Sequence, residues 1–283
     1  MYGVLCMIKR SHEFSYFPYD IMSRYRELRA AYGERDSDIY VSTYTRSGTT
    51  WMQMILYQLT TDGNMDFDHI YDVSPWFYYS ARWSIIPTCS PDPRILKTHD
   101  YYNFYDANTK GKFVYVIRDG KDVIVSFYHH KINVKGYTGT FEEHFDECVN
   151  ADYYNCVNGD YYNWFEHVKG WLENKNNFPI LYVKYESLKN DFDNEVKRII
   201  DFCDIPVNDS ILKRTKERTN FTFMKKCSSQ LGPPRKPKSH HQFIRKGLIG
   251  EGSQRLTNKQ KDMFSKKFHE TLGHLDLVSE YGE

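Results

Sequence analysis

The stretch DIYVSTYTRSGTTWMQMILYQLT (residues 38–60) decides the fold, because it joins a β-rich run directly to a helical pattern. Residues 38–44 are rich in β-branched and aromatic side chains, as expected of a strand. Residues 51–60 carry apolar side chains at helical spacing. Between them, RSGTT holds one arginine, one glycine and three hydroxyl side chains, but it lacks the GxxxxGK[ST] spacing of an ordinary nucleotide loop. The loop therefore needs another explanation.

Three further β-rich runs follow along the chain. They are RILKTH (94–99), KFVYVIRD (112–119) and PILYVKYE (179–186). A helical pattern follows the first run, at 38–44, and the last two. Strands that alternate with helices predict a parallel sheet covered on both faces. We therefore expect one α/β domain over residues 1–283, with a central parallel sheet flanked by helices.

The composition fits one large domain. The chain has 283 residues, a mass of 33.8 kDa, 40% hydrophobic residues and a mean hydropathy of −0.68. The 24 Tyr and 18 Phe residues can build a substantial core. The formal net charge is +1, so no global field marks a nucleic-acid binder. Any anion site must therefore be local.

The cysteines and the N-terminus predict a cytoplasmic protein. Six cysteines are scattered without a CxxC pair, which indicates reduced thiols rather than a disulfide framework. The first apolar run spans only about six residues, shorter than the core of a signal peptide. No stretch approaches the roughly 18 apolar residues of a membrane span. We expect no membrane partner.

The loop after the first strand is a candidate anion site. Ligands of parallel sheets bind at the carboxyl ends of the strands, and the unpaired N–H groups of a helix N-terminus attract anions. Gly48 allows close approach of the backbone, and Arg46 adds a permanent charge. The ordinary alternative is that Thr49 or Thr50 simply caps the helix.

Other segments offer further candidates. In KTH, the strand period of two places Lys97 and His99 on one face, which suits charge stabilisation beside a base. Arg118 ends the third run, and Ser126 lies about two turns into the next helix. The late segment FIRKGLIG (243–250) has a basic pair beside two glycines. The ordinary alternatives are a structural histidine, a salt-bridged arginine and a solvated loop.

Three other regions have compositions of their own. Residues 228–250 are rich in Pro, Gly and basic residues, which predicts an irregular, mobile loop. Residues 136–178 are helical and rich in Tyr, Asn and Trp, which is typical of core or pocket wall. The last 30 residues predict an amphipathic helix.

Six motifs together resemble those of the cytosolic sulfotransferases. In order, they are TYTRSGTTW, RILKTH, VYVIRDGKDVIVSFYH, ILYVKYE, TNFTFMKK and FIRKG. The resemblance runs from about residue 36 to about residue 268. This family transfers a sulfonyl group from 3'-phosphoadenosine 5'-phosphosulfate (PAPS) to an alcohol, phenol or amine and releases PAP. The resemblance implies PAPS as cofactor, no required metal, and a P-loop-like loop for the phosphosulfate.

The resemblance also assigns cofactor contacts to individual residues. The implied contacts to the 5'-phosphosulfate come from Arg46, Ser47, Gly48, Thr49 and Thr50. Those to the 3'-phosphate come from Arg118, Ser126, Arg245, Lys246 and Gly247. Those to the adenine and the rest of the nucleotide come from Trp51, Tyr185, Thr219, Phe221 and Met224. Residues 228–250 would cover the cofactor.

Three residues have implied catalytic roles. His99 matches the general base that deprotonates the acceptor hydroxyl, and Lys97 matches a lysine that stabilises charge on the sulfonyl group. The acceptor oxygen would attack sulfur in line, with catalysis mainly by positioning and charge stabilisation. Arg46 stands where the family usually has lysine. Arginine keeps the charge but does not readily donate its proton, so we expect slower or differently gated turnover.

The chain departs from the family at two other motifs. The family's GDW reads GEG at residues 250–252, and the dimerisation pattern KxxxTVxxxE is not visible. The family's dimer is therefore not carried over. Aromatic segments predict a hydrophobic acceptor pocket for a phenol, a sterol or another alcohol. The candidate acceptor-binding residues are Phe17, Trp76, Phe77 and Tyr137.

Two other functions remain open. A nucleotide-dependent kinase of related fold would use Asp119 to bind magnesium, although the missing GK[ST] and the presence of KTH count against it. A non-catalytic module that binds PAP is the second alternative. Binding alone would not require Lys97 beside a base such as His99.

Overall fold

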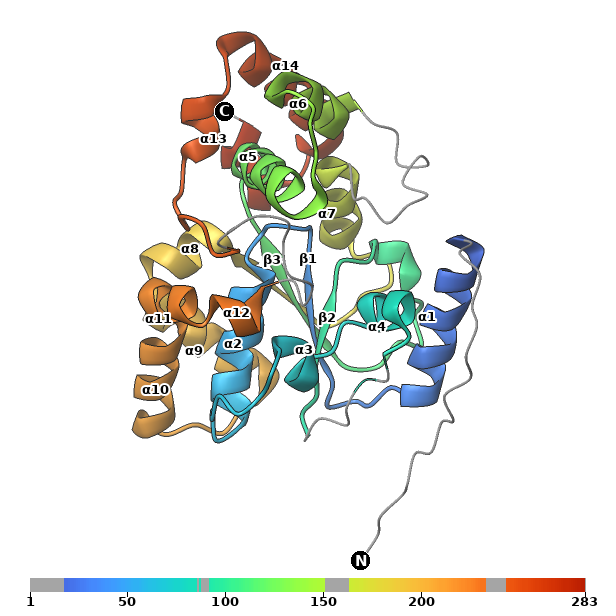
Figure 1. Ribbon diagram of the computed structural model, residues 1–283, viewed down its shortest axis with the longest axis vertical. Helices are drawn as coiled ribbons and strands as arrows, with labels where there is room; N and C mark the ends of the chain where they lie inside the picture. The colour runs from blue at the N-terminus through green and yellow to red at the C-terminus, as the bar shows by residue number, and fades with distance from the viewer. Residues whose placement is uncertain (1–17, 86, 88–91, 151–162, 233–242, 283) are drawn as a thin grey trace, which may run out of the picture.

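A parallel sheet stands at the centre of the protein (Figure 1). The structure, a computed structural model, describes residues 18–85, 87, 92–150, 163–232 and 243–282. Within these residues the sheet has four strands in the order β2-β1-β3-β4, and each neighbouring pair is parallel. The strands are β1 (Ile39–Thr43), β2 (Ile95–Thr98), β3 (Lys112–Ile117) and β4 (Ile180–Lys184). The predicted parallel α/β sheet is confirmed.

Helices follow β1, β3 and β4, as the sequence predicts. They are α2 (Thr49–Thr60) after β1, α5 (Gly120–His130) after β3, and α8 (Tyr185–Asn190) and α9 (Phe192–Cys203) after β4. The other helical segments are α1 (Pro18–Tyr32), α3 (Ile70–Val73), α4 (Phe77–Trp83), η1 (Tyr102–Phe104), η2 (Lys131–Lys135), α6 (Phe141–Asn150), α7 (Trp164–Glu173), α10 (Asp209–Thr219), α11 (Phe221–Lys226), α12 (Ser228–Leu231), α13 (Glu251–Arg255), α14 (Asn258–Leu272) and η4 (Asp276–Gly282).

Each face of the sheet has its own hydrophobic core, because successive strand side chains point to opposite faces. Tyr40 and Tyr115 belong to an aromatic core formed with α1, α4, α5, α6, α7 and α14. Val41 and Val114 belong to a mainly aliphatic core under α2, α3, α8, α9, α11 and α12. In the aromatic core the Tyr115 ring stacks on Trp171 at 5.2 Å between centroids. Figure 1 shows helices flanking the sheet on both sides.

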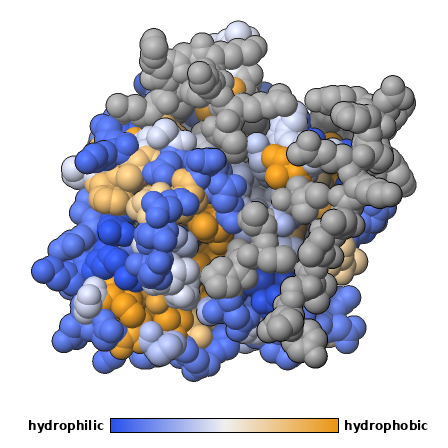
Figure 2. Space-filling view, turned by 60° about the horizontal axis from the view of Figure 1, so that its bottom comes forward, coloured by the Kyte–Doolittle hydropathy of each residue, from blue (hydrophilic) through white to orange (hydrophobic). Residues whose placement is uncertain are grey.

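Polar residues predominate on one face of the protein (Figure 2). On the face in Figure 2, hydrophilic residues cover most of the coloured surface and apolar patches lie between them. In the described part of the chain, no helix combines the length and apolar character needed to cross a membrane. Cys148, Cys203 and Cys227 are free thiols. The other three cysteines lie outside the described residues.

The segment expected to be irregular from residue 228 begins instead as helix α12. It forms because Leu231 is buried in the aliphatic core. The side chain of Gln230 also donates to two backbone carbonyls of the segment after α2, at 3.1 and 2.7 Å. Residues 233–242 lie outside the described residues. The helix expected near the C-terminus is α14, which begins with a capping box at Thr257.

A buried ion pair joins the entry of β1 to that of β2. Arg94 donates from Nε to Asp38 Oδ1 at 2.7 Å and from Nη2 to Asp38 Oδ2 at 2.6 Å. It also donates to the backbone carbonyls of Tyr32 and Gly33, just after α1. Both charged side chains are fully buried. Because each desolvated charge depends on its partner, removal of one is costly.

We predict that Asp38→Ala lowers the free energy of unfolding by about 3–5 kcal/mol, since it leaves Arg94 buried and unpaired. Urea denaturation measures this change. The matched control is Asp36→Ala, because Asp36 pairs with Lys110 at 3.6 Å on the surface. That pair should contribute at most about 1 kcal/mol. Equal effects of the two substitutions would contradict the prediction.

Candidate active site

A cavity of about 550 Å³ opens at the carboxyl ends of the strands. Residues at the carboxyl ends of all four strands contribute to it. So do α10, α11 and residues 243–248 of the late segment. All the predicted cofactor residues except Ser47 line this cavity, as do Lys97, His99 and Trp76. The fold thus brings together residues that are up to about 200 positions apart in the sequence, as expected for a parallel sheet.

Several predicted residues do not line the cavity. Ser47 is fully buried beside it. Phe77 packs in the aromatic core, edge-on to Tyr32 at 5.0 Å between ring centroids. Tyr137 lies instead with its ring 4.0 Å from the Lys131 ammonium. Phe17 lies outside the described residues.

The loop between β1 and α2 turns sharply to reach the cavity. Gly48 is the N-cap residue of α2 at φ 102°, and no side chain caps the helix. Simple capping by Thr49 or Thr50 is therefore not what the structure contains. A Cβ atom on Gly48 would lie 2.9 Å from Cδ2 of Tyr185, so only glycine fits without a shift. Thr49 faces inward, with its hydroxyl 2.6 Å from that of Thr43.

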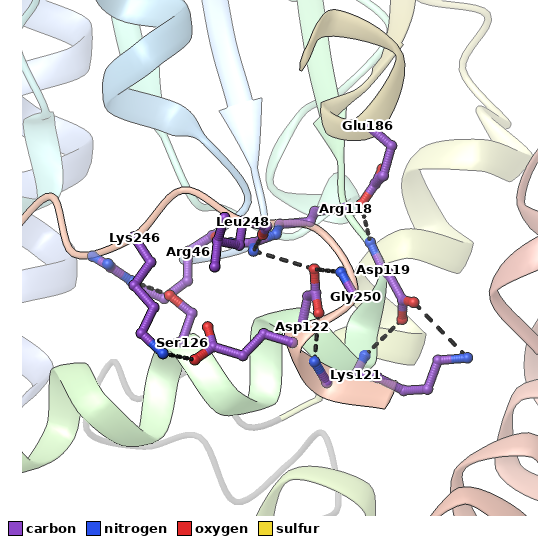
Figure 3. A network of polar contacts seen from close by, with 12 residues as sticks. Arg46, Arg118, Asp119, Lys121, Asp122, Ser126, Glu186, Lys246, Leu248 and Gly250 are labelled. Carbon is purple, nitrogen blue, oxygen red and sulfur yellow. Dashed lines mark hydrogen bonds and ion pairs between the residues drawn. The ribbon is translucent and has the colours of Figure 1, made fainter. Parts of the chain in front are cut away.

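Arg46 crosses from this loop to neighbouring segments (Figure 3). Its Nε donates to the hydroxyl of Ser126 in α5 at 3.2 Å. Its Nη2 donates to the carbonyl of Phe243 at 3.4 Å, and its guanidinium lies 4.9 Å from the centre of the Phe243 ring. The arginine that replaces the family's lysine therefore connects the first loop to α5 and to the late segment.

Arg118, just after β3, contacts the first loop, the late segment and α5. Its Nη1 donates to the Arg46 carbonyl at 3.2 Å, and its Nη2 donates to the Leu248 carbonyl at 2.8 Å. It also pairs with Asp122 at 3.3 Å and lies 4.5 Å from the centre of the Tyr185 ring. The ordinary salt bridge is thus present, yet Arg118 still lines the cavity, and its buried Nε has no hydrogen-bond partner within the described part of the chain.

Glu251 forms ion pairs with both basic residues of the late segment. Arg245 donates to it through two nitrogens, with Nη1 at 2.8 Å from Oε1, and Lys246 donates at 3.0 Å. The hydrogen bond from Arg245 is the main reason that the pKa of Glu251 falls to about 2. Because Glu251 also lines the cavity, an anion that binds Arg245 must compete with this carboxylate.

The GEG sequence closes the late segment by backbone hydrogen bonds. Asp122 accepts from the N–H of Gly250 at 3.0 Å and from that of Gly252 at 2.6 Å. A Cβ atom on Gly252 would lie 2.3 Å from the carbonyl carbon of Lys121. The position that carries tryptophan in the family's GDW is therefore packed directly against α5 here. In this chain, the hydrogen bonds to Asp122 hold the late segment against α5 instead.

Positive charge is concentrated in the cavity. Burial, followed by the charges of Arg118 and Arg245, lowers the pKa of Arg46 to about 10. Burial and the charge of Arg46 lower the pKa of Lys97 to about 7. Burial is the larger cause of both shifts, and the neighbouring cations add to it because they disfavour each other's charged forms. A bound anion would relieve that repulsion.

His99 follows β2 and is buried against the first loop. Its Nδ1 lies 2.8 Å from the Thr43 carbonyl, which can only accept, so Nδ1 carries the proton and Nε2 remains basic. The ring is edge-on to Trp76 at 5.2 Å between centroids. Burial, followed by the charge of Lys97, lowers the pKa of His99 well below its usual value. The imidazole is therefore neutral at physiological pH.

Sequence reasoning missed part of the cavity wall. Tyr71, Phe127 and Val134 line it, although none lies at a strand end or was a candidate site residue. For Tyr71 the only available signal is its place a few residues before Trp76, in a segment without a motif.

Asp119, the magnesium ligand of the kinase alternative, has a structural position. Its carboxylate accepts from the Lys121 N–H at 2.8 Å and caps α5, and it does not line the cavity. Burial raises the pKa of Asp119 to about 7. In the described part of the chain, no three His, Cys, Asp or Glu side chains lie together as a metal site would need.

Comparisons with known proteins agree with this geometry. The family model described as "Sulfotransferase domain" matches residues 36–276. Mouse sulfotransferase 1B1 is 31% identical over 257 residues, covering 85% of this chain and 84% of its own. Human sulfotransferase 1C2 is 28% identical over 256 residues, covering 84% of each chain. The crystal structure of mouse sulfotransferase SULT7A1 complexed with PAP has a TM-score of 0.70 at 25% identity, covering 91% of this chain and 92% of that one.

A match over most of the chain, together with a 31% identical relative, establishes the family. The chain belongs to the sulfotransferase family, whose members are transferases of sulfonyl groups.

We predict that Gly48→Ala destabilises the protein by about 2 kcal/mol or more, because the new methyl group combines a positive φ with a clash against Tyr185. The matched control is Gly33→Ala, at φ 67° with no atom within 4 Å of the added Cβ. There only the backbone cost of about 1 kcal/mol applies. Urea denaturation compares the two variants. A smaller effect at Gly48 than at Gly33 would refute the close packing of this loop.

Proposed function

We infer that this protein transfers a sulfonyl group from PAPS to the hydroxyl of a hydrophobic small molecule, with His99 as the base, and releases PAP. The observation that carries this inference is the meeting, in one cavity, of a neutral buried His99 with Lys97, Arg46, Arg118 and Arg245. Membership of the sulfotransferase family supports the reaction class.

The donor matches the distribution of charge. PAPS has anionic groups at both ends of its nucleoside, and several cations line the cavity. The charges of Arg118 and Arg245 act on Arg46, and the charge of Arg46 acts on Lys97. The buried Oγ of Ser47 and Nε of Arg118 have no hydrogen-bond partner among the described residues, as expected where phosphate oxygens supply the acceptors. PAP is the nucleotide bound to the similar mouse structure.

The proposed mechanism uses His99, Lys97 and Arg46. Because Nδ1 of His99 is held by the Thr43 carbonyl, its Nε2 is the atom that takes the proton of the acceptor hydroxyl. The resulting oxygen attacks sulfur while the bond from sulfur to the PAP oxygen breaks. Lys97 and Arg46 stabilise the charge that develops on the sulfonyl and phosphate oxygens. A bound anion raises the pKa of Lys97, which keeps it protonated.

The proposed acceptor region is the aromatic wall beside His99. Trp76, Tyr79, Phe127 and Val134 line it together with Tyr71. Mostly apolar and aromatic walls bind flat or hydrophobic alcohols, such as phenols or sterols, and polar groups orient the reacting hydroxyl. A cytoplasmic location remains a prediction from the sequence.

The magnesium-dependent kinase alternative has less support. Asp119 caps α5 and does not line the cavity, so it is poorly placed to hold a metal ion against a bound nucleotide. A module that only binds PAP is also less favoured. Lys97, His99 and the aromatic wall line the same cavity, with His99 edge-on to Trp76, and binding alone would not require a base beside a cation.

We predict that PAP stabilises the purified protein in EDTA. At a hundredfold excess over its dissociation constant, PAP should add about 2.7 kcal/mol to the free energy of unfolding. Thermal denaturation with PAP, with ATP and with ATP plus magnesium measures the effect, all but the last in EDTA. Stabilisation only by ATP with magnesium would favour a kinase and reject the PAPS assignment.

We also predict that His99→Asn lowers kcat at least about a hundredfold, because the base is lost. PAP binding should remain, as measured by the same thermal shift. The control is His274→Asn, since His274 is exposed and distant from the cavity, 3.7 Å from Glu173. Full transfer activity in His99→Asn would disprove the assignment of the base.

A further inference from the structure

Lys97 has a partner that neither the motifs nor the proposed reaction assigns. Its ammonium donates to the hydroxyl of Tyr71 at 2.8 Å. It lies 4.8 Å from the centre of the Tyr71 ring and 4.2 Å from that of Trp76. Two aromatic faces and one hydroxyl therefore surround the cation, which is a favourable cage for an ammonium group.

The backbone holds this cage in place. The N–H of Lys97 donates to the Pro75 carbonyl at 2.9 Å, which fixes the segment beside β2. Buried Gln53 of α2 donates to the Ser74 carbonyl at 3.2 Å and to its hydroxyl at 3.0 Å. The N–H of Tyr71 itself donates to Nδ1 of His69 at 3.1 Å, within a capping box. Tyr71 is thus fixed from both sides of its segment.

The surroundings of Lys97 make this contact important. Lys97 is 7% exposed, and among the described residues no carboxylate lies within ion-pair distance of it. Arg46 is the charged group that acts on it, and it opposes protonation. Burial raises the pKa of Tyr71, so this side chain is a neutral phenol and a good acceptor for the ammonium. Tyr71 therefore supplies the favourable polar contact that a carboxylate would supply elsewhere.

We propose that Tyr71 is a positioning residue for sulfonyl transfer, which holds Lys97 as a protonated ammonium aimed into the cavity. This inference rests on the proposed function. The hydroxyl of Tyr71 uses one of the three donors of the ammonium, and the aromatic faces restrict its rotation. A neutral hydroxyl does this without cancelling the charge that the reaction needs.

A carboxylate at the place of Tyr71 would hold Lys97 more strongly, but it would form a closed ion pair and repel the anionic donor. A phenylalanine would leave the ammonium with aromatic faces alone. Tyrosine is the side chain that both orients the cation and leaves its charge available. The role concerns kcat, because Lys97 acts on charge that develops during transfer.

The test is Tyr71→Phe, which keeps the ring and removes only the hydroxyl. A hydrogen bond accepted from an ammonium favours the charged form, so its loss lowers the pKa of Lys97 further. The alkaline limb of the profile of kcat against pH should then move to lower pH by about one unit, since bonds to charged donors are the stronger ones. At a pH at least one unit above the wild-type limb, kcat should fall about tenfold, and KM for PAPS should change by less than about threefold.

Tyr79→Phe is the matched control for the loss of a hydroxyl from the same wall. Tyr79 lies 5.1 Å from Tyr71 between ring centroids, but the bond from Lys97 runs to Tyr71. Its substitution should leave the alkaline limb in place, whatever it does to KM for the acceptor. An equal shift in both variants would reduce Tyr71 to a general part of the wall and overturn the proposal.

A double-mutant cycle shows whether Tyr71 acts through Lys97. In a Lys97→Met background, Tyr71→Phe should change kcat by less than about twofold. A full tenfold fall there would mean that Tyr71 acts independently, and the proposal would be wrong. A higher KM for the acceptor with an unchanged limb would assign Tyr71 to acceptor binding and would also overturn it.

The thermal shift with PAP separates this inference from the proposed function. If PAP fails to stabilise the wild-type protein and no transfer is found, the proposed function fails. If the wild-type protein binds PAP and transfers sulfonyl groups while the limb of Tyr71→Phe does not move, only the role of Tyr71 fails. The thermal shift of Tyr71→Phe with PAP also checks that the variant is folded.

Discussion

The guanidinium of Arg118 is the interaction on which the site depends. It bonds to the carbonyls of Arg46 and Leu248, pairs with Asp122 and packs on the ring of Tyr185. These partners come from the loop after β1, the late segment, α5 and the residue after β4. One planar group with several donors can join four segments in this way, whereas a lysine cannot. The cavity thereby gains its shape from a residue that also lines it.

The positive charge of the cavity is not fully compensated by the protein's own carboxylates. The net charge is only +1, yet Arg46, Arg118 and Lys97 face one cavity. Asp122 and Glu251 compensate in part, and the lowered pKa values of Arg46 and Lys97 reflect burial first and then the remaining repulsion. Such unfavourable charge is typical of sites that bind a highly charged ligand, because binding energy then offsets the repulsion. The ammonium of Lys97 also donates a hydrogen bond to the hydroxyl of Tyr71.

Much of this could be predicted from local sequence. The β-rich runs and the helical patterns locate the sheet, and the carboxyl ends of its strands locate Arg46, Lys97 and Arg118 near one another. The positions of the aromatic residues were harder to predict, because the sequence alone does not distinguish a side chain of the hydrophobic core from one that lines the cavity. Trp76 lines the cavity, while its neighbour Phe77 turns into the aromatic core. One step along the start of a helix rotates the side chain by about 100 degrees, and only packing decides which side is which.

The sequence by itself determined the α/β fold and the chemical types at the strand ends, since both follow from short-range periodicity and from residues adjacent to strands. Only the tertiary structure decided the pairings that cross the chain: Tyr71 with Lys97, Arg46 with Ser126, and Asp122 with Gly250. Such pairs depend on the packing of distant segments at the scale of one hydrogen bond. A side chain's neighbours at that scale are set by the whole core, and no local pattern encodes them.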